Sequence, residues 1–376
     1  MISPDPHTPF PLRPFPFKRI IIEKRVRSAP LTEKILKALP HLPVEWRDQE
    51  AVQYPPESIS DSKKTLYLTR FKGELIRPCP GTRDYICCGY RILHIGTNCP
   101  MDCSYCILQA YFNQPYTRLF VNIDEIFSQL NQFVQSHPGE IIRLGTGEFT
   151  DSLAFDPLTG FSGFLFKELS SYPQVVVELK TKTTAIGNLI QSPPLKNIIV
   201  SWSLNPPEII RKEERGAASL TERLEAALAC LRKGFHLGFH FDPIFYFPGW
   251  EEVYHQTIRL LFSKIRPDRI AWISLGCFRF IPHLKSIIQQ RSPNSRYIYQ
   301  EFIPALDKKM RYVQPQRVEI YRKMLEWLKT YGNDVLVYLC MENPSVWEKV
   351  FGFIPGEGHP SLTEMLDQRA RDLVRK

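Results

Sequence analysis

The chain has 376 residues, of which 43% are hydrophobic and 12% aromatic. This apolar content is sufficient for one large domain or two ordinary ones, and it excludes a disordered chain and a small scaffold held by disulfides. The 48 lysines and arginines outnumber the 39 aspartates and glutamates, so the net charge of +9 is compatible with a polyanionic partner without requiring one.

The sequence predicts a soluble, cytoplasmic protein, which we expect to be a monomer. No stretch is apolar for long enough to cross a bilayer, and prolines between positions 4 and 16 interrupt any apolar N-terminal helix of the kind that a secretory signal needs. The nine cysteines are odd in number and show no framework spacing, which favours reduced thiols.

Residues 1–89 are predicted to form an N-terminal arm and a small extension. Residues 1–18 alternate proline with phenylalanine, which is typical of an extended arm. The β-branched run 19–26 and residues 65–70 predict strands, and residues 31–39 predict a short helix.

Residues 90–280 alternate strands with amphipathic helices. The predicted strands are 91–95, 140–144, 175–179, 197–203, 236–241 and 269–275, and the clearest helices are 123–136, 160–170, 220–233 and 253–264. Six such units predict an α/β fold, a partial (β/α)6 barrel of the TIM-like kind. In that architecture the chemistry lies where the strands end.

Residues 281–376 are predicted to form an α+β cap on this barrel. Residues 286–290 and 296–302, on either side of a turn-like segment, predict a β-ribbon. Helices are predicted at 317–331, 345–351 and 361–374, with a strand at 335–341.

The strongest functional signal is a C-x3-C-x2-C cluster made by Cys99, Cys103 and Cys106, directly after the first barrel strand. Three thiolates on one short loop can hold three irons of a [4Fe–4S] cluster. The fourth iron is then free to bind the amino and carboxylate groups of S-adenosylmethionine, whose reductive cleavage yields a 5′-deoxyadenosyl radical.

Two other interpretations of this cluster are open. The three cysteines could be structural thiols, or they could bind zinc together with His94, Cys87 or Cys88. Structural zinc usually takes paired C-x2-C units, and the second pair is missing here. The position of the loop after a strand of a βα repeat favours a cofactor.

The cluster, with an aromatic residue before its last cysteine, resembles the signature of radical S-adenosylmethionine enzymes. The longer run 99–112 (CPMDCSYCILQAYF) resembles the spore photoproduct lyase family in particular. Further segments that resemble this family are 19–24 (RIIIEK), 203–227 (SLNPPEIIRKEERGAASLTERLEAA), 238–250 (GFHFDPIFYFPGW) and 337–352 (VYLCMENPSVWEKVFG). The resemblance implies a lyase that repairs a thymine lesion in DNA and that takes electrons from a flavodoxin- or ferredoxin-type donor.

The chain departs from the family at the end of the second barrel strand. In spore photoproduct lyases a cysteine there returns a hydrogen atom to the product radical, whereas residues 145–156 (GTGEFTDSLAFD) contain no cysteine. The family position falls at or next to Glu148, which cannot donate a hydrogen atom. A family tyrosine after the third cluster cysteine is Ile107 here, although Tyr105 is kept.

The resemblance implies further residues of a cofactor pocket. Glu148, in a Gly-x-Gly-Glu element, and Lys182 would meet the methionine part of S-adenosylmethionine. Ser203 and Asn205 are candidates by their position alone: they end the fourth strand, where short polar side chains could bond the ribose hydroxyls or the carboxylate. The alternatives are an ordinary glycine loop, a solvated lysine and a capped turn before two prolines. Asp242 either contacts a ligand or satisfies the turn at the following proline.

Cys277 follows the sixth strand and is our candidate for a replacement hydrogen donor, a catalytic role beside that of Tyr105. The alternative is a small buried hydrophobic side chain. The other cysteines are interpreted as structural or are left without a role: Cys79, Cys87, Cys88, Cys230 and Cys340.

A basic segment with interleaved aromatic residues begins near the end of the barrel. Its members are Arg279, Lys285, Arg291, Arg296, Lys308, Lys309, Arg311, Tyr297, Tyr299 and Phe302. Such a surface could neutralise phosphates and separate a base step, which a buried radical site would need. The alternative is an ordinary solvated surface.

The sequence therefore supports three hypotheses for function. The favoured one is a radical S-adenosylmethionine lyase that repairs damaged DNA. The second keeps the radical chemistry but acts on RNA, a peptide or a small molecule, because the family's hydrogen donor is missing. The third is a non-catalytic, metal-stabilised protein that binds nucleic acid.

Overall fold

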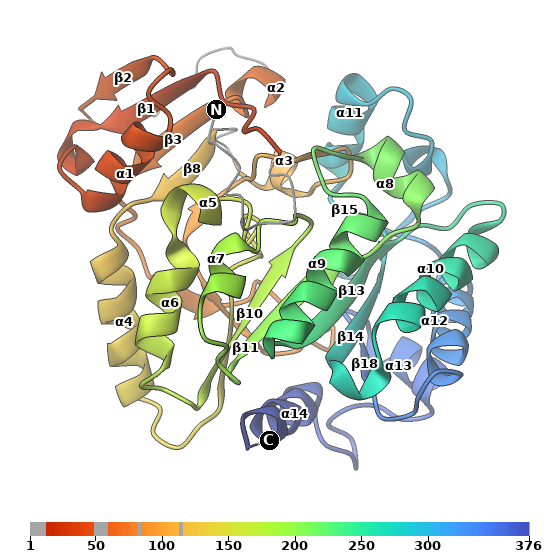
Figure 1. Ribbon diagram of the computed structural model, residues 1–376. Helices are drawn as coiled ribbons and strands as arrows, with labels where there is room; N and C mark the ends of the chain where they lie inside the picture. The colour runs from red at the N-terminus through yellow and green to blue at the C-terminus, as the bar shows by residue number, and fades with distance from the viewer. Residues whose placement is uncertain (1–12, 49–58, 82–83, 113–115, 376) are drawn as a thin grey trace.

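The computed structural model describes residues 13–48, 59–81, 84–112 and 116–375. A curved sheet of eight strands forms its centre, in the order β18-β14-β13-β11-β10-β9-β5-β4 (Figure 1). The strands are β4 (Ile76–Pro78), β5 (Arg91–Leu93), β9 (Ile142–Gly145), β10 (Val175–Thr181), β11 (Ile198–Ser203), β13 (His236–Ile244), β14 (Ile270–Cys277) and β18 (Leu336–Leu339). All neighbours pair in parallel except β4 and β5. The predicted partial barrel is confirmed.

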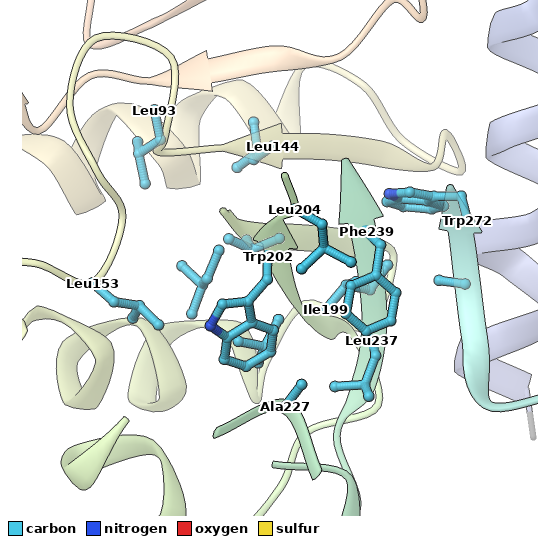
Figure 2. Close-up of a cluster of buried hydrophobic side chains, with 14 of the residues drawn as sticks. Leu93, Leu144, Leu153, Ile199, Trp202, Leu204, Ala227, Leu237, Phe239 and Trp272 are labelled. Atoms are coloured by element: carbon cyan, nitrogen blue, oxygen red, sulfur yellow. The ribbon is translucent and has the colours of Figure 1, made fainter. Parts of the chain in front are cut away.

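Helices pack along the outer, convex face of this sheet (Figure 1). They are α4 (Ile123–Gln135), α5 (Asp156–Thr159), α6 (Phe161–Leu169), α7 (Gly187–Gln191), α8 (Pro207–Glu213), α9 (Leu220–Lys233) and α10 (Trp250–Lys264). The start of α9 is set by a capping box between Ser219 and Glu222. Its buried Ala227 packs near Trp202 of β11 in the core between helix and sheet (Figure 2).

The strands follow the two-residue alternation that a curved, covered sheet requires. In β10, Val175, Val177 and Leu179 are fully buried on one face, while Glu178 and Lys180 face the concave side and line a cavity there. Each barrel strand can therefore place polar groups in the cavity without breaking the hydrophobic core.

A second sheet has the order β2-β1-β3-β8-β6. It contains β1 (Arg19–Glu23), β2 (Val44–Arg47), β3 (Thr65–Thr69), β6 (Gly96–Thr97) and β8 (Thr117–Phe120), and the short helices α1 (Pro30–Ala38) and α2 (Ile59–Ser62) belong to the same part of the chain. The predicted strands at 19–26 and 65–70 and the helix at 31–39 are confirmed. We call the segment between β6 and β8, which carries the three cluster cysteines, the cluster loop. Because β6 and β8 flank this segment, the second sheet holds both of its ends.

The cluster loop is also tied to the barrel. Within it, β7 (Asp102–Cys103) pairs antiparallel with β12 (Glu214–Arg215), so Cys103 lies opposite Glu214. The helix α3 (Leu108–Tyr111) follows the third cysteine. Two sheets thus position the three thiols.

The C-terminal part differs from its prediction at one point. Residues 286–290 lie in the helix α11 (Pro282–Arg291), and 296–302 contain a 3-10 turn at Tyr297–Tyr299 instead of a ribbon strand. Pro282 is suited to the first turn of a helix, and Leu284, Ile287 and Ile288 are buried at helical spacing. A small three-stranded sheet forms elsewhere, from β15 (Arg279–Phe280), β16 (Ile303–Pro304) and β17 (Met310–Arg311).

The remaining predicted helices are confirmed as α12 (Gln314–Lys329), α13 (Pro344–Phe351) and α14 (Leu362–Arg375). The predicted strand at 335–341 is also present as β18, but it joins the barrel sheet by pairing with β14. Within the part of the chain that the structure describes, no helix is both long and apolar enough to span a membrane. The arm's first twelve residues lie outside the described residues.

Candidate active site

A cavity of about 370 Å³ lies on the concave face of the barrel sheet, at the end where the parallel strands terminate. It brings together most of the residues predicted to form the site. The predicted residues that line it are Cys99, Cys103, Tyr105, Cys106, Glu148, Lys182, Ser203 and Asp242. Asn205 and Cys277 are not among the lining residues.

The three cluster cysteines line one end of the cavity as free thiols. Burial raises the pKa of Cys99 to about 12 and also raises that of Cys103. Among the described residues, no three His, Cys, Asp or Glu side chains converge closely enough to hold a single metal ion. A cubane cluster takes each thiolate at a different iron and does not need such convergence, so the donor set fits an iron–sulfur cluster.

Cations surround the cluster loop and hold Asp102, between the first two cysteines. Arg291 contacts one Asp102 oxygen at 2.8 Å and Lys63 contacts the same oxygen at 3.2 Å, while Arg215 contacts the other at 3.2 Å. Lys63 is 8% exposed and also donates to the carbonyl of Met101. We call Lys63, Arg215 and Arg291 the loop clamp. The sequence did not predict it, because the three cations come from three distant segments.

The neighbouring cluster cysteines also affect the pKa of Lys63. Burial on its own lowers the pKa of a lysine, but the neighbouring Cys99, Cys106 and Asp102 outweigh burial and raise the pKa of Lys63. A buried ammonium beside three thiols favours their thiolate form, which is the form that binds iron.

A buried carboxylate, Glu214, organises the next layer of residues. It accepts hydrogen bonds from the Tyr105 hydroxyl and from Asn205 at 3.0 Å, and it forms an ion pair with the fully buried Arg223. Although burial on its own raises the pKa of a carboxyl, Arg223 and then Lys182 hold that of Glu214 at about 2. Asn205 therefore supports Glu214 and does not itself line the cavity.

Glu148 lies at the end of β9 with its carboxylate in the cavity. Tyr90 donates its hydroxyl to this carboxylate at 2.7 Å, and the Lys180 ammonium lies 4.0 Å away. A side chain at Gly145 would approach the Tyr90 ring to 2.5 Å, and Gly145 has no positive φ. The glycine is therefore required by the close approach of Tyr90 and not by an unusual turn.

Lys182 lies where β10 ends, at the side of Tyr105. Its ammonium is 5.8 Å from the centre of the Tyr105 ring. The buried carboxylate of Asp151 accepts the backbone N–H of Lys182 at 2.9 Å and the Thr181 hydroxyl at 2.8 Å. Asp151 was not singled out from the sequence, although it lies three residues after Glu148 in the same loop.

Other residues that line the cavity form polar contacts that the sequence did not reveal. Glu178 accepts hydrogen bonds from Ser201 at 2.5 Å and from Trp272 at 2.8 Å. Its carboxylate also lies 2.8 Å from the His240 ring. Burial on its own raises the pKa of a carboxyl, but His240 and these donors lower that of Glu178 to about 2. Asp242 forms two contacts with Arg279, at 3.2 and 3.0 Å.

The predicted replacement hydrogen donor, Cys277, does not line the cavity. Cys277 is 2% exposed, and its backbone N–H donates to Tyr321 at 2.8 Å. Four other cysteines, which were interpreted as structural or left without a role, line the cavity: Cys79, Cys87, Cys88 and Cys340.

Part of the basic segment is neutralised by carboxylates. Arg279 is paired with Asp242, Arg291 with Asp102, and the buried Arg311 with Asp307 at 2.6 Å. The exposed members of the segment are Lys285, Arg296, Lys308 and Tyr299. Arg296 also lines a second hollow of about 960 Å³, together with Arg215 and Arg291 of the loop clamp. The surface available to a polyanion is therefore smaller than the sequence suggested.

The family model for spore photoproduct lyase matches residues 87–324. The chain belongs to the spore photoproduct lyase family. Two similar relatives are the spore photoproduct lyases of Clostridium acetobutylicum, 23% identical over 291 residues, and of Bacillus subtilis, 24% identical over 294 residues. The matches cover 74% and 75% of this chain and 84% of each relative.

Solved structures of spore photoproduct lyase variants have the same fold. One, with bound AdoMet and dinucleoside spore photoproduct, has a TM-score of 0.77 and 22% identity, and another has a TM-score of 0.78. Each match covers 87% of this chain and all of the other. The family resemblance, the barrel fold and the enzyme class, a radical S-adenosylmethionine lyase, are thereby confirmed.

Proposed function

We propose that this protein binds a [4Fe–4S] cluster through Cys99, Cys103 and Cys106, cleaves S-adenosylmethionine reductively and repairs a thymine lesion in DNA. The observation that carries the proposal is one cavity, in a member of this family, that is lined by the three cluster thiols and by Glu148, Lys182 and Ser203. A solved relative with bound AdoMet and dinucleoside spore photoproduct supports both the cofactor and the kind of substrate.

The chain's own residues hold and orient these partners. The cluster and S-adenosylmethionine, once bound, would together supply a carbon-centred radical. Glu148 would accept the methionine ammonium, with Tyr90 fixing its carboxylate, while Lys182 and Ser203 would bind polar groups of the cofactor. Tyr105 and Asn205 hold this wall in place through Glu214.

The substrate would reach the same cavity from the side of the exposed basic residues. Arg296 and Lys308 can neutralise phosphates, and a damaged base step costs less to unstack than a normal one. We further propose that the enzyme acts as a monomer in the cytoplasm and takes its electrons from a flavodoxin- or ferredoxin-type donor.

Anaerobic reconstitution followed by turnover tests the proposal. The holoprotein should contain about four irons per chain and release 5′-deoxyadenosine when it is reduced with S-adenosylmethionine. Incubation with ultraviolet-irradiated oligonucleotides should restore thymines, measured by mass spectrometry of the digested DNA.

Cys103→Ala serves as the negative control, because it removes one iron ligand and should abolish both products. A wild-type protein that releases 5′-deoxyadenosine but leaves every thymine lesion intact would contradict the proposed substrate. A protein that binds zinc in place of iron under these conditions would contradict the chemistry as a whole.

A further inference from the structure

One cysteine of the cavity, Cys87, is hydrogen bonded to two others. Cys87 forms side-chain hydrogen bonds with both Cys79 and Cys88, and all three line the cavity together with Cys340. Cys79 follows β4, while Cys87 and Cys88 precede β5, so the trio sits at the edge of the barrel sheet. We call these three residues the thiol trio.

Backbone contacts hold the trio in place. The Cys79 N–H donates to the carbonyl of Tyr90 at 3.1 Å, and the carbonyl of Cys88 accepts from the guanidinium of Arg143. Arg143 is in turn held by Asp367 of α14 at 2.5 Å. The trio is therefore an ordered part of the cavity wall, contacted by elements from three parts of the chain.

The three sulfurs differ in how readily they ionise. The hydrogen bonds from Cys79 and then Cys88 lower the pKa of Cys87, whereas the pKa values of Cys79 and Cys88 are raised, first by their bonds to Cys87 and then by burial. Within the trio, Cys87 therefore loses its proton more readily than Cys79 or Cys88.

This arrangement suits the donation of a hydrogen atom. An S–H bond is weaker than most C–H bonds, so a thiol at the cavity wall can quench a carbon radical formed inside the cavity. The thiolate of Cys87 touches both donors, so a sulfur radical formed on either one can share its unpaired electron with it. Glu148, where the resemblance placed the family's donor, is electrostatically coupled to Cys79.

We propose that Cys79 and Cys88, on either side of Cys87, are the hydrogen-atom donors to the substrate radical in this enzyme. The inference rests on the proposed function. In the step an S–H bond breaks, a C–H bond forms and a sulfur radical remains. One electron from the flavodoxin- or ferredoxin-type donor and one proton from solvent then restore the thiol.

The other cysteines near the cavity fit this role less well. Cys277 does not line the cavity. Cys340 does line it, but its sulfur lies 3.5 Å from the guanidinium of Arg279, which also holds Asp242. Cys340 is therefore placed beside a charged pair and not in the hydrogen-bonded trio.

Turnover in deuterated buffer tests the proposal, because thiol hydrogens exchange with solvent. The wild-type enzyme should place one solvent-derived deuterium in each repaired product. The double variant Cys79→Ala/Cys88→Ala should still release 5′-deoxyadenosine, but should form at least tenfold less deuterated product for each molecule released. Cys230→Ala, at a buried cysteine of α9 that does not line the cavity, is the matched control and should behave as wild type.

A second measurement does not depend on turnover. Iodoacetamide labelling of the holoprotein at pH 6, mapped by peptide mass spectrometry, should modify Cys87 faster than Cys340, because the thiolate is the reactive form. Cys79→Ala removes a hydrogen bond to Cys87 and should slow that labelling severalfold.

The outcomes separate this inference from the proposed function. If the wild-type protein cleaves S-adenosylmethionine and repairs lesions, and the double variant still deuterates its product fully, the thiol trio is not the donor. If the product lost its deuterium only in Cys340→Ala or Cys277→Ala, the assignment of the thiol trio as donor would likewise be overturned. A wild-type protein without any 5′-deoxyadenosine release would instead contradict the proposed function.

Discussion

Glu214 shows how much of the site depends on a single buried residue. The residue is 2% exposed, and its carboxylate joins Arg223 to the two predicted site residues Tyr105 and Asn205. A buried charge is tolerated only when it is paired and hydrogen bonded. Tyr105 and Asn205 are therefore held in place by this buried ion pair.

At this scale we predict that Arg223→Leu strongly destabilises the protein, because it leaves the Glu214 carboxylate buried without its cation. The free energy of unfolding should fall by about 3–5 kcal/mol, measured by urea denaturation. Lys212→Ala is the control: it breaks the exposed pair with Glu208 at 2.6 Å and should cost less than about 1 kcal/mol. Equal losses in the two variants would show that Glu214 does not need Arg223.

At the scale of elements, the cluster loop is the segment whose position decides function. It is held at its ends by β6 and β8, in its middle by the pairing of β7 with β12, and at Asp102 by Lys63, Arg215 and Arg291. Residues that orient the ligands of a metal centre usually matter for its affinity nearly as much as the ligands themselves.

We therefore predict that Asp102→Asn weakens retention of the cluster while leaving all three cysteines in place. Iron loss to a chelator should be about 10–100-fold faster than in the wild type, followed by the decay of the brown absorbance. Asp61→Asn removes a carboxylate whose pair with Lys64, at 3.1 Å, is largely exposed, and it should lose iron at the wild-type rate. Identical rates for both variants would argue against the clamp.

At the scale of the whole molecule, two carboxylates with lowered pKa values link stability to pH. The pKa values of Glu178 and Glu214 are both lowered from 4.5 to about 2, against the effect of burial, by His240 in the first case and Arg223 in the second. A lowered pKa means that the stabilisation is complete above about pH 4.5 and is lost as the pH falls towards about 2.

Acid unfolding should therefore be steep in this window, with each of the two groups contributing up to about 3 kcal/mol. Glu178→Gln should lower the stability at pH 6 and make its further loss below pH 4.5 shallower, measured by urea denaturation at a series of pH values. The exposed Glu319→Gln should follow the wild-type curve. A Glu178→Gln curve parallel to the wild type would contradict this assignment.

The excess of positive charge is also a property of the whole molecule, but only exposed cations can release counterions from DNA. We predict that Arg296→Ala weakens binding to duplex oligonucleotides and reduces the salt dependence of log K by about 0.9, measured by fluorescence anisotropy at several salt concentrations. Arg232→Ala, exposed on α9 at the outer face, should change neither quantity. A similar effect of both variants would indicate diffuse attraction and no defined DNA surface.

The sequence by itself determined those features that depend on spacing along the chain. The C-x3-C-x2-C run, the alternating pattern of β10 and the helical periodicity of α9 are local, because covalent connection and backbone period decide which side chains share a loop or a face. For the same reason the six barrel strands and the family could be predicted. A ribbon was wrongly predicted at 286–302, because turn residues there resembled a hairpin. Burial of Leu284, Ile287 and Ile288 favours the helix α11 instead.

Only the tertiary structure decided which distant residues meet. Lys63 reaches Asp102 across 39 residues, and Tyr105 reaches Glu214 across 109. Likewise, Cys87 meets Cys79, while Cys277 is kept out of the cavity. Such contacts depend on how sheets and loops pack, and periodicity along one segment carries no information about a partner in another.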